Sequence, residues 1–295
     1  MNLYRHKDAN IRKTWLLFAV FFVVIIGIGW AASVFYNDLA ILVFAVLLSV
    51  GMSIASYWYS DKIVLSMSRA HPVERENASE LYNVVENLAI TAGLPMPRVF
   101  LIDEPSPNAF ATGRNPKHAA VAVTTGLLER LDRSELEGVL SHELSHIGNR
   151  DMLVSTVAVV LVGFAALIAG WVRYSFFFGG FGGRRREGGG GGVVMLIGLV
   201  LAILAPIATM LLQLAISRRR EYLADASGVL LTRYPEGLAR ALEKISTAPK
   251  MARVNDATAH LWLSDPKPRR PHITKWFMTH PPIEDRIARL RGMRV

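Results

Sequence analysis

The chain has 295 residues, of which 52% are hydrophobic, and its mean hydropathy is +0.30, a composition that favours a membrane protein over a soluble one. Its formal net charge is +9, but the basic residues mostly flank apolar runs, as they do beside anionic lipid headgroups, and no nucleic-acid-binding module is evident. Cysteine is absent, which excludes disulfides and thiolate ligands, so a metal site must use His, Asp or Glu.

Four uncharged apolar runs reach the length of about 20 residues that a bilayer crossing needs. They are Thr14–Phe35, Leu39–Tyr59, Leu153–Trp171 and Val193–Ile216. Basic residues precede the first run and follow the second, whereas the short link between these runs has none, so the positive-inside rule places both ends of this hairpin in the cytoplasm. The sequence therefore predicts a multi-pass membrane protein.

The polar region between the second and third runs predicts a small α+β unit. The expected elements are a helix at Ala78–Ala92, a segment at Arg98–Ile102, strands at Asn108–Thr112 and Ala119–Thr124, and a helix from Asp132 through His146. Gly, Asn and Pro at residues 113–118 predict a turn between the last two strands. Asp132, with Glu135 three residues on, fits a capping box at the start of the long helix.

The third and fourth apolar runs enclose a Gly-rich stretch, Gly179–Gly192, that contains Arg184, Arg185 and Arg186 and predicts a flexible loop. Two crossings would place these arginines outside, against the charge rule, and zero crossings would make the pair a re-entrant hairpin. The length of both runs favours two crossings. Helical patterns in the tail cover Glu221–Thr232, Pro235–Ser246 and Ile283–Arg291.

The sharpest signal is an H-E-x-x-H motif at residues 142–146. His142 and His146 lie one helical turn apart, so their imidazoles can share one Zn²⁺, and Glu143 beside them is placed as general base toward a zinc-activated water. The alternative is an amphipathic helix with two solvated histidines. We expect one zinc ion per chain, because the surrounding features agree with a zinc site.

A second carboxylate pair, Glu221 and Asp225, has the same one-turn spacing just after the fourth run. Taken alone, the pair would be an ordinary charged helix face. Beside the H-E-x-x-H motif, Glu221 becomes the candidate third zinc ligand, and Asp225 the acceptor of the free ring N–H of a ligating histidine. His280, held before two prolines, is the candidate catalytic residue that stabilises the oxyanion, although by itself it would be a surface histidine.

Three segments together resemble the HtpX family of bacterial membrane proteases, whose wider relatives include the CaaX prenyl protease and a mitochondrial quality-control protease. They are residues 142–151, residues 217–225 and residues 279–282, and residues 108–113 also match. The resemblance covers nearly the whole chain and implies a gluzincin-like site with Glu221 as third ligand. It also implies an endopeptidase that degrades damaged or misfolded membrane proteins under stress.

The predicted fold is mostly α with a small β-sheet, in which four membrane helices carry a cytoplasmic zincin-like domain built on the H-E-x-x-H helix. Residues 1–60 form the N-terminal hairpin, 61–152 and 217–295 the two parts of the catalytic domain, and 153–216 the second hairpin. Two other functions stay open: a narrow-specificity processing protease, and a catalytically silent scaffold with a retained zinc site. The small number of membrane runs disfavours the processing protease, and the intact Glu143 disfavours the silent scaffold.

Substrate is expected to lie as an extended peptide on the edge strand at residues 108–112, because an exposed edge offers unpaired N–H and C=O groups. The expected substrate-binding residues are Asn108, Ala109, Phe110, Ala111 and Thr112. Small side chains there let another backbone approach, and the more apolar strand Ala119–Thr124 is expected inside the sheet. Physiological substrates, oligomeric state and the role of the Gly/Arg-rich insert do not follow from the sequence.

Overall fold

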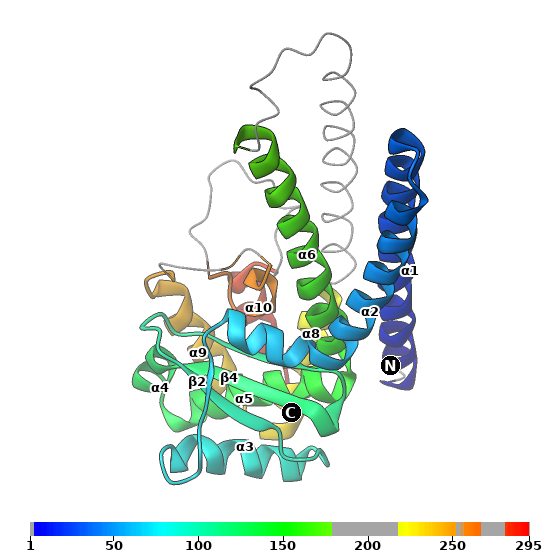
Figure 1. The fold of residues 1–295 in the computed structure, drawn as a ribbon. Helices are drawn as coiled ribbons and strands as arrows, with labels where there is room; N and C mark the ends of the chain where they lie inside the picture. Colours follow the sequence, from blue (N-terminus) through cyan, green and yellow to red (C-terminus); the bar gives the residue numbers. More distant parts are fainter. Residues whose placement is uncertain (1–2, 179–217, 252–254, 256, 267–280, 295) are drawn as a thin grey trace.

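The computed structural model describes residues 3–178, 218–251, 255, 257–266 and 281–294 (Figure 1). Its helices and strands are, in chain order, α1 Leu3–Tyr36, α2 Leu39–Met67, β1 His71–Pro72, α3 Ser79–Thr91, β2 Arg98–Ile102, β3 Ala109–Gly113, the 3₁₀ turn Pro116–His118, β4 Ala119–Thr124, α4 Thr125–Arg130, α5 Arg133–Asn149, α6 Asp151–Phe178, α8 Arg218–Thr232, α9 Pro235–Thr247, the 3₁₀ turn Ala259–Leu261 and α10 Ile283–Arg291.

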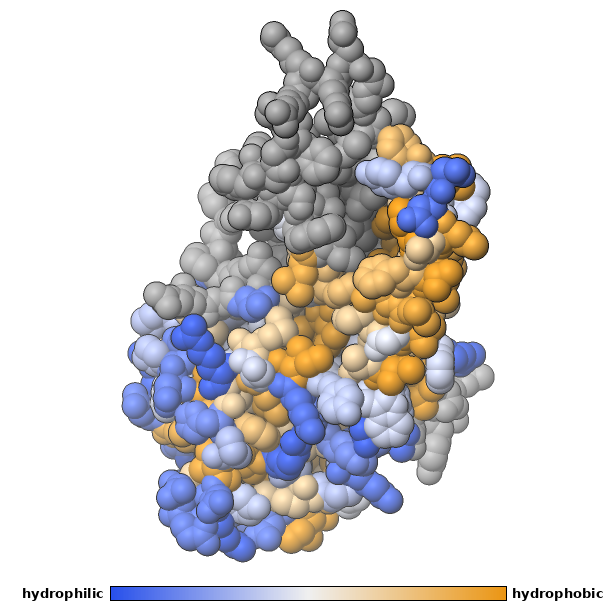
Figure 2. Space-filling model, in the orientation of Figure 1, coloured by the Kyte–Doolittle hydropathy of each residue, from blue (hydrophilic) through white to orange (hydrophobic). Residues whose placement is uncertain are grey.

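The first two helices form an antiparallel hairpin that projects from the rest of the molecule (Figure 1). Both are long and apolar enough to cross a membrane. The helices cross closely at Gly29, where an added Cβ would lie 2.2 Å from the Cβ of Ala45. Large apolar side chains cover the outside of the hairpin and make the continuous hydrophobic surface in Figure 2. Such a surface would be unfavourable in water and fits a lipid environment.

The third apolar run lies in α6, which packs against the hairpin through a cluster that includes Phe21 and Leu161. Helix α6 leaves α5 at an angle of 85°, and Arg150 at the bend takes a left-handed backbone conformation with φ of 55°. The expectation of four membrane helices is thus met only in part: among the residues that the structure describes, two helices qualify as spans, and a third exists only if α5 and α6 count as one bent span. The fourth run, Val193–Ile216, lies outside the described residues.

A four-stranded sheet in the order β1-β2-β4-β3 forms the centre of the polar part. Strands β2 and β4 are parallel, and the other neighbours are antiparallel. Alternate side chains enter two separate cores. On one face they pack with α3 and α5, and on the other with the end of α2, with α6 and with Trp262. Strand β4 is buried along its whole length, which explains its continuous run of small apolar residues.

The polar elements follow the sequence predictions closely. Helix α3 and strands β2 and β4 have the expected bounds to within a residue, and β3 begins one residue later than expected. Strand β3 lies at the edge and β4 inside, as predicted. The capping box at the start of α5 is present, since Asp132 accepts from the amide of Glu135 and the Glu135 side chain accepts from the amide of Asp132.

Candidate metal centre

Three potential metal ligands meet at the buried side of α5. His142 and His146 lie one turn apart on this helix, and their Nε2 atoms are 3.0 Å apart. Glu221, from the first turn of α8, places its carboxylate oxygens 3.8 Å from Nε2 of His142 and 3.7 Å from Nε2 of His146. Ligands about 2.0–2.1 Å from one tetrahedral ion lie roughly 3.3 Å from each other. The three side chains therefore fit a single metal ion without a change of backbone.

A glycine lets α8 come close enough for Glu221 to reach the histidines. Gly228 lies against the α5 backbone, and an added Cβ would be 3.0 Å from both the amide nitrogen of His142 and Oγ of Ser141. Glu221, Asp225 and Gly228 are spaced by four and three residues, so they share the face of α8 that packs on α5. The one-turn spacing of Glu221 and Asp225 thus places both carboxylates on the face of α8 that contacts α5.

Each histidine is held from behind by a carboxylate. Nδ1 of His142 lies 2.9 Å from Asp225, and Nδ1 of His146 lies 3.1 Å from Asp151. A carboxylate acceptor places the ring proton on Nδ1, which leaves a lone pair on each Nε2. Two lone pairs directed at each other across 3.0 Å repel unless a proton or a metal ion lies between them. The arrangement is the usual one behind histidines that bind a metal.

The net charge of the buried groups also matches a divalent cation. Glu143, Asp151, Glu221 and Asp225 carry four negative charges when ionised, and the only arginines buried with them in the described part of the chain are Arg220 and Arg286. The balance is two negative charges. Consistent with this, burial lowers the pKa of His146, but Asp151, Glu221 and Glu143 outweigh burial and raise that pKa to about 10.

Arg286 on α10 is completely buried beside the ligands. Its Nε and Nη2 donate to the two Asp225 oxygens over 2.9 and 2.6 Å, and Nη1 donates to the Leu263 carbonyl over 3.1 Å. Burial raises the pKa of the Asp225 carboxyl, but Arg286 and His142 outweigh burial and hold this pKa below its usual value. Arg286 therefore keeps Asp225 ionised, and Asp225 in turn fixes the ring of His142.

Glu143 is buried next to the ligands, and its environment suits a proton acceptor near neutral pH. Burial is the main effect on its pKa, which rises to about 7. The backbone amide of Ala111 in β3 hydrogen-bonds the Glu143 carboxylate and acts in the opposite direction. The candidate base thus touches the candidate substrate-binding strand. A general base works best when its pKa lies near the operating pH.

The backbone of β3 alternates between its partner and the free edge of the sheet. The carbonyl of Asn108 accepts from the amide of Thr124, so the antiparallel pattern turns the backbone groups of Phe110 and Thr112 toward β4. Those of Ala109, Ala111 and Gly113 face outward.

Part of this edge is already in use. The carbonyl of Ala109 accepts from the amide of Leu263, and the buried side chain of Asn108 bonds to Ser264. The Phe110 ring packs on Trp262 in the core, and the Thr112 hydroxyl meets that of Thr156. Of the five expected substrate-binding residues, Ala111 therefore has the outward backbone groups nearest Glu143.

Two residues of this site, Asp151 and Arg286, were not predicted from the sequence. Asp151 lies just past the H-E-x-x-H helix, but only the bend at Arg150 returns it to His146. Arg286 gives a signal in retrospect, because it lies on the apolar stripe of α10 with Ile287 and Leu290. An arginine on such a stripe must have a buried partner. His280 lies outside the described residues, so its catalytic role stays a prediction.

Comparison with known proteins identifies the family. The model of peptidase family M48 matches residues 75–294. The chain belongs to peptidase family M48. A protease HtpX homolog of Tropheryma whipplei (strain Twist) is 46% identical, covering 99% of this chain and 98% of its own length, and one of Syntrophobacter fumaroxidans is 48% identical, covering 95% and 98%.

One solved structure has a similar fold. The crystal structure of S. mikatae Ste24p superposes with a TM-score of 0.51 at 20% identity, covering 94% of this chain and 66% of that one. This likeness concerns the fold alone. As an M48 peptidase, the protein is a metalloprotease that hydrolyses peptide bonds, and the cluster of His142, His146 and Glu221 is suited to hold its metal.

Proposed function

We propose that this M48 peptidase is a membrane-anchored, zinc-dependent endopeptidase that cleaves damaged or misfolded membrane proteins. The observation that carries the proposal is that the ligand cluster, the candidate base and the edge strand lie together in a domain attached to apolar helices. The ligand cluster on α5 and α8 lies beside Glu143, Glu143 contacts the edge strand β3, and this domain is joined directly to apolar helices. Stress-dependent quality control is the role implied by the resemblance to the HtpX proteases.

In this proposal His142, His146 and Glu221 hold zinc, and the other residues prepare the reaction. Bound zinc supplies a Lewis acid that polarises the scissile carbonyl and makes water more acidic. Glu143 accepts a proton from the attacking water and returns it to the leaving amine. Asp225 and Asp151 hold the ligand rings in one orientation, and His280 is the proposed donor to the oxyanion.

The substrate is proposed to bind through its backbone. An extended chain that adds to the free edge of β3 would use the outward backbone groups of Ala111 and Gly113. The amide of Ala111, which contacts Glu143 in the absence of substrate, becomes a donor to the substrate. Because these residues have at most a methyl side chain, the strand discriminates little between substrate side chains. Broad cleavage of unfolded segments follows more readily than cleavage at one motif.

The proposal is tested with the Glu143→Gln variant of the full chain in detergent. Casein serves as unfolded substrate, and metal content is measured on the same preparations. Glu143→Gln should keep its zinc and lose nearly all cleavage, since the ligands remain and the base is lost. Glu137→Gln is the matched control, because Glu137 is partly exposed on the same helix and, within the described part of the chain, forms an ion pair with Arg133. Wild-type turnover by Glu143→Gln would reject the mechanism.

We further propose that the catalytic domain faces the cytoplasm and that the chain crosses a bacterial inner membrane four times. The end of α5 and the start of α8 both lie at the ligand cluster, so residues 151–217 must leave and re-enter on one side, by two crossings or none. A cysteine at Gly188, introduced into a chain without native cysteine, should react with an impermeant reagent added outside intact cells. Reaction only after lysis would favour the re-entrant alternative.

A further inference from the structure

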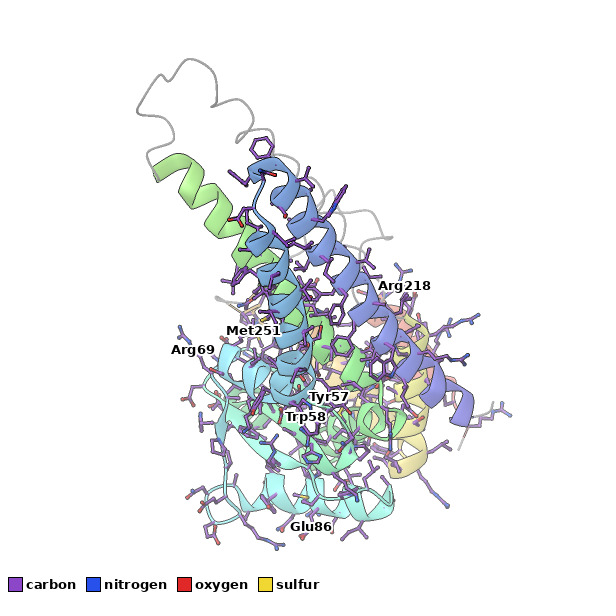
Figure 3. The ribbon with its side chains drawn as sticks, turned by 45° about the vertical axis from the view of Figure 1, so that its right-hand side comes forward. Tyr57, Trp58, Arg69, Glu86, Arg218 and Met251 are labelled. Carbon is purple, nitrogen blue, oxygen red and sulfur yellow. The ribbon has the colours of Figure 1, made fainter. Side chains whose placement is uncertain are left out.

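The outward face of α2 changes from apolar to basic within one helical turn. Exposed apolar side chains follow this face at helical spacing: Val43, Leu47, Val50, Ile54 and Trp58. Lys62, four residues after Trp58, continues the same line and is exposed. Figure 3 shows Trp58 at the foot of the hairpin, next to the polar domain. In a membrane protein, an aromatic residue followed by a lysine marks the level of the lipid headgroups.

A hollow of about 470 Å³ opens at this level. Its walls come from three places: the last turns of α2, Met96 and Arg98 just before and at the start of β2, and the turn between β3 and β4. The volume lies within the range of roughly 300–1,000 Å³ that is usual for small-ligand sites. Figure 2 shows that the polar surface of the domain adjoins the hydrophobic surface of the hairpin.

The walls of the hollow carry a surplus of positive charge. Four cationic side chains line it, from Lys62, Arg98, Arg114 and Lys117, against one carboxylate, from Asp61. Arg98 pairs with Asp61. Within the described ranges, no carboxylate lies in ion-pair distance of the other three cations.

Aromatic rings hold two of these three cations in place. The Arg114 guanidinium lies 4.3 Å from the centre of the Trp58 ring and Lys62 lies 5.5 Å from that of Tyr59. Both rings belong to the foot of the hairpin. The cations are thus positioned at the predicted headgroup level, and no anion among the described residues neutralises them.

We propose that this hollow binds the headgroup of an anionic phospholipid. The phosphate contacts Arg114, Lys117 and Lys62, and the acyl chains extend along the apolar stripe of α2 beyond Trp58. Free phosphate would satisfy the cations but would leave the adjoining stripe without a partner. A phospholipid matches both parts of the surface at once, because its charge and its hydrocarbon are covalently joined in this order. The bound lipid would fix the depth of the hairpin relative to the polar domain.

The experiment measures lipid binding directly and does not depend on proteolytic activity. The full chain, purified in an uncharged detergent, is titrated with phosphatidylglycerol, with phosphatidylcholine and with inorganic phosphate, and retained lipid is counted by native mass spectrometry. The double substitution Arg114→Gln and Lys117→Gln removes two of the cations. Arg130→Gln with Arg133→Gln is the matched control, because these exposed arginines lie outside the hollow.

Wild type and control should retain phosphatidylglycerol in preference to phosphatidylcholine. The Arg114/Lys117 variant should bind it about thirty-fold more weakly, at about fivefold for each basic residue near a lipid surface. Equal retention by this variant, or displacement of the lipid by inorganic phosphate at millimolar concentration, would overturn the proposal. If that variant does not fold, Lys62→Gln with Lys117→Gln, both exposed positions, gives the same comparison.

Discussion

The role assigned to Arg286 can be tested by replacing it with methionine, which has a similar length and no charge. Among the described side chains, Arg286→Met leaves the buried Asp225 carboxylate with only His142 as donor, since both Arg286 hydrogen bonds to it are lost. Removal of one partner from a buried ion pair costs about 3–5 kcal/mol. For a domain of this size, each kcal/mol lowers Tm by about 2–4 °C, so the expected decrease is roughly 6–20 °C.

The metal site should respond as well. Asp225 fixes the ring of His142, and loss of such support typically reduces metal affinity about 10–100-fold. Thermal unfolding followed by circular dichroism and zinc titration against a chelator measure the two effects. Arg289→Met, one turn of α10 away at an exposed position, is the control and should change Tm by no more than a few degrees.

A second substitution separates the effect of an unpaired buried charge from the effect of losing the orientation of the His142 ring. Arg286→Met combined with Asp225→Leu leaves neither charge unpaired, so Tm should recover in part relative to Arg286→Met alone. Zinc affinity should stay low, because nothing then holds Nδ1 of His142. An Arg286→Met protein with wild-type Tm and wild-type zinc affinity would refute the reasoning.

Three further predictions concern the other supports of the site. Asp151→Asn removes the charge behind His146 and should weaken zinc about 10–100-fold in a chelator titration, and unchanged affinity would show that the contact is incidental. Gly228→Val should force α8 away from α5 and lower zinc content, whereas Leu230→Val on the exposed side of α8 should not. Ala111→Pro removes the outward amide that contacts Glu143, so casein cleavage should fall while zinc content is kept, and normal cleavage by the folded variant would move substrate docking elsewhere.

Local patterns in the sequence predicted the parts of the fold that depend on local chemistry. The capping box Asp132/Glu135, the β3–β4 hairpin and the two apolar helices each depend on residues close together in the sequence. The structure shows each of them. The inside position of β4 followed from its apolar content, since a strand buried on both faces needs no polar alternation. One-turn spacing likewise predicted His142 and His146 as a pair.

Long-range contacts could not be predicted in the same way. Arg286 reaches Asp225 across 61 residues, and its partner depends on how α10 packs on α8. Asp151 is close to His146 in sequence, but a continuous helix would not return it to the ring, and the left-handed Arg150 does. Strand β3 was expected from its sequence to be an edge, but nothing local showed that residues 262–264 pack against the side chains of Asn108 and Phe110.

The most direct test of the central claim is the metal itself. X-ray absorption at the zinc edge, together with the zinc-to-protein ratio of the purified full chain, should give one zinc per chain with two imidazole nitrogens and oxygen ligands at about 2.0–2.2 Å. Glu221→Ala and His146→Ala should each lose the metal, because each removes one of the three ligands that meet on α5 and α8. A wild-type ratio far below one, or full zinc occupancy in Glu221→Ala, would contradict the account.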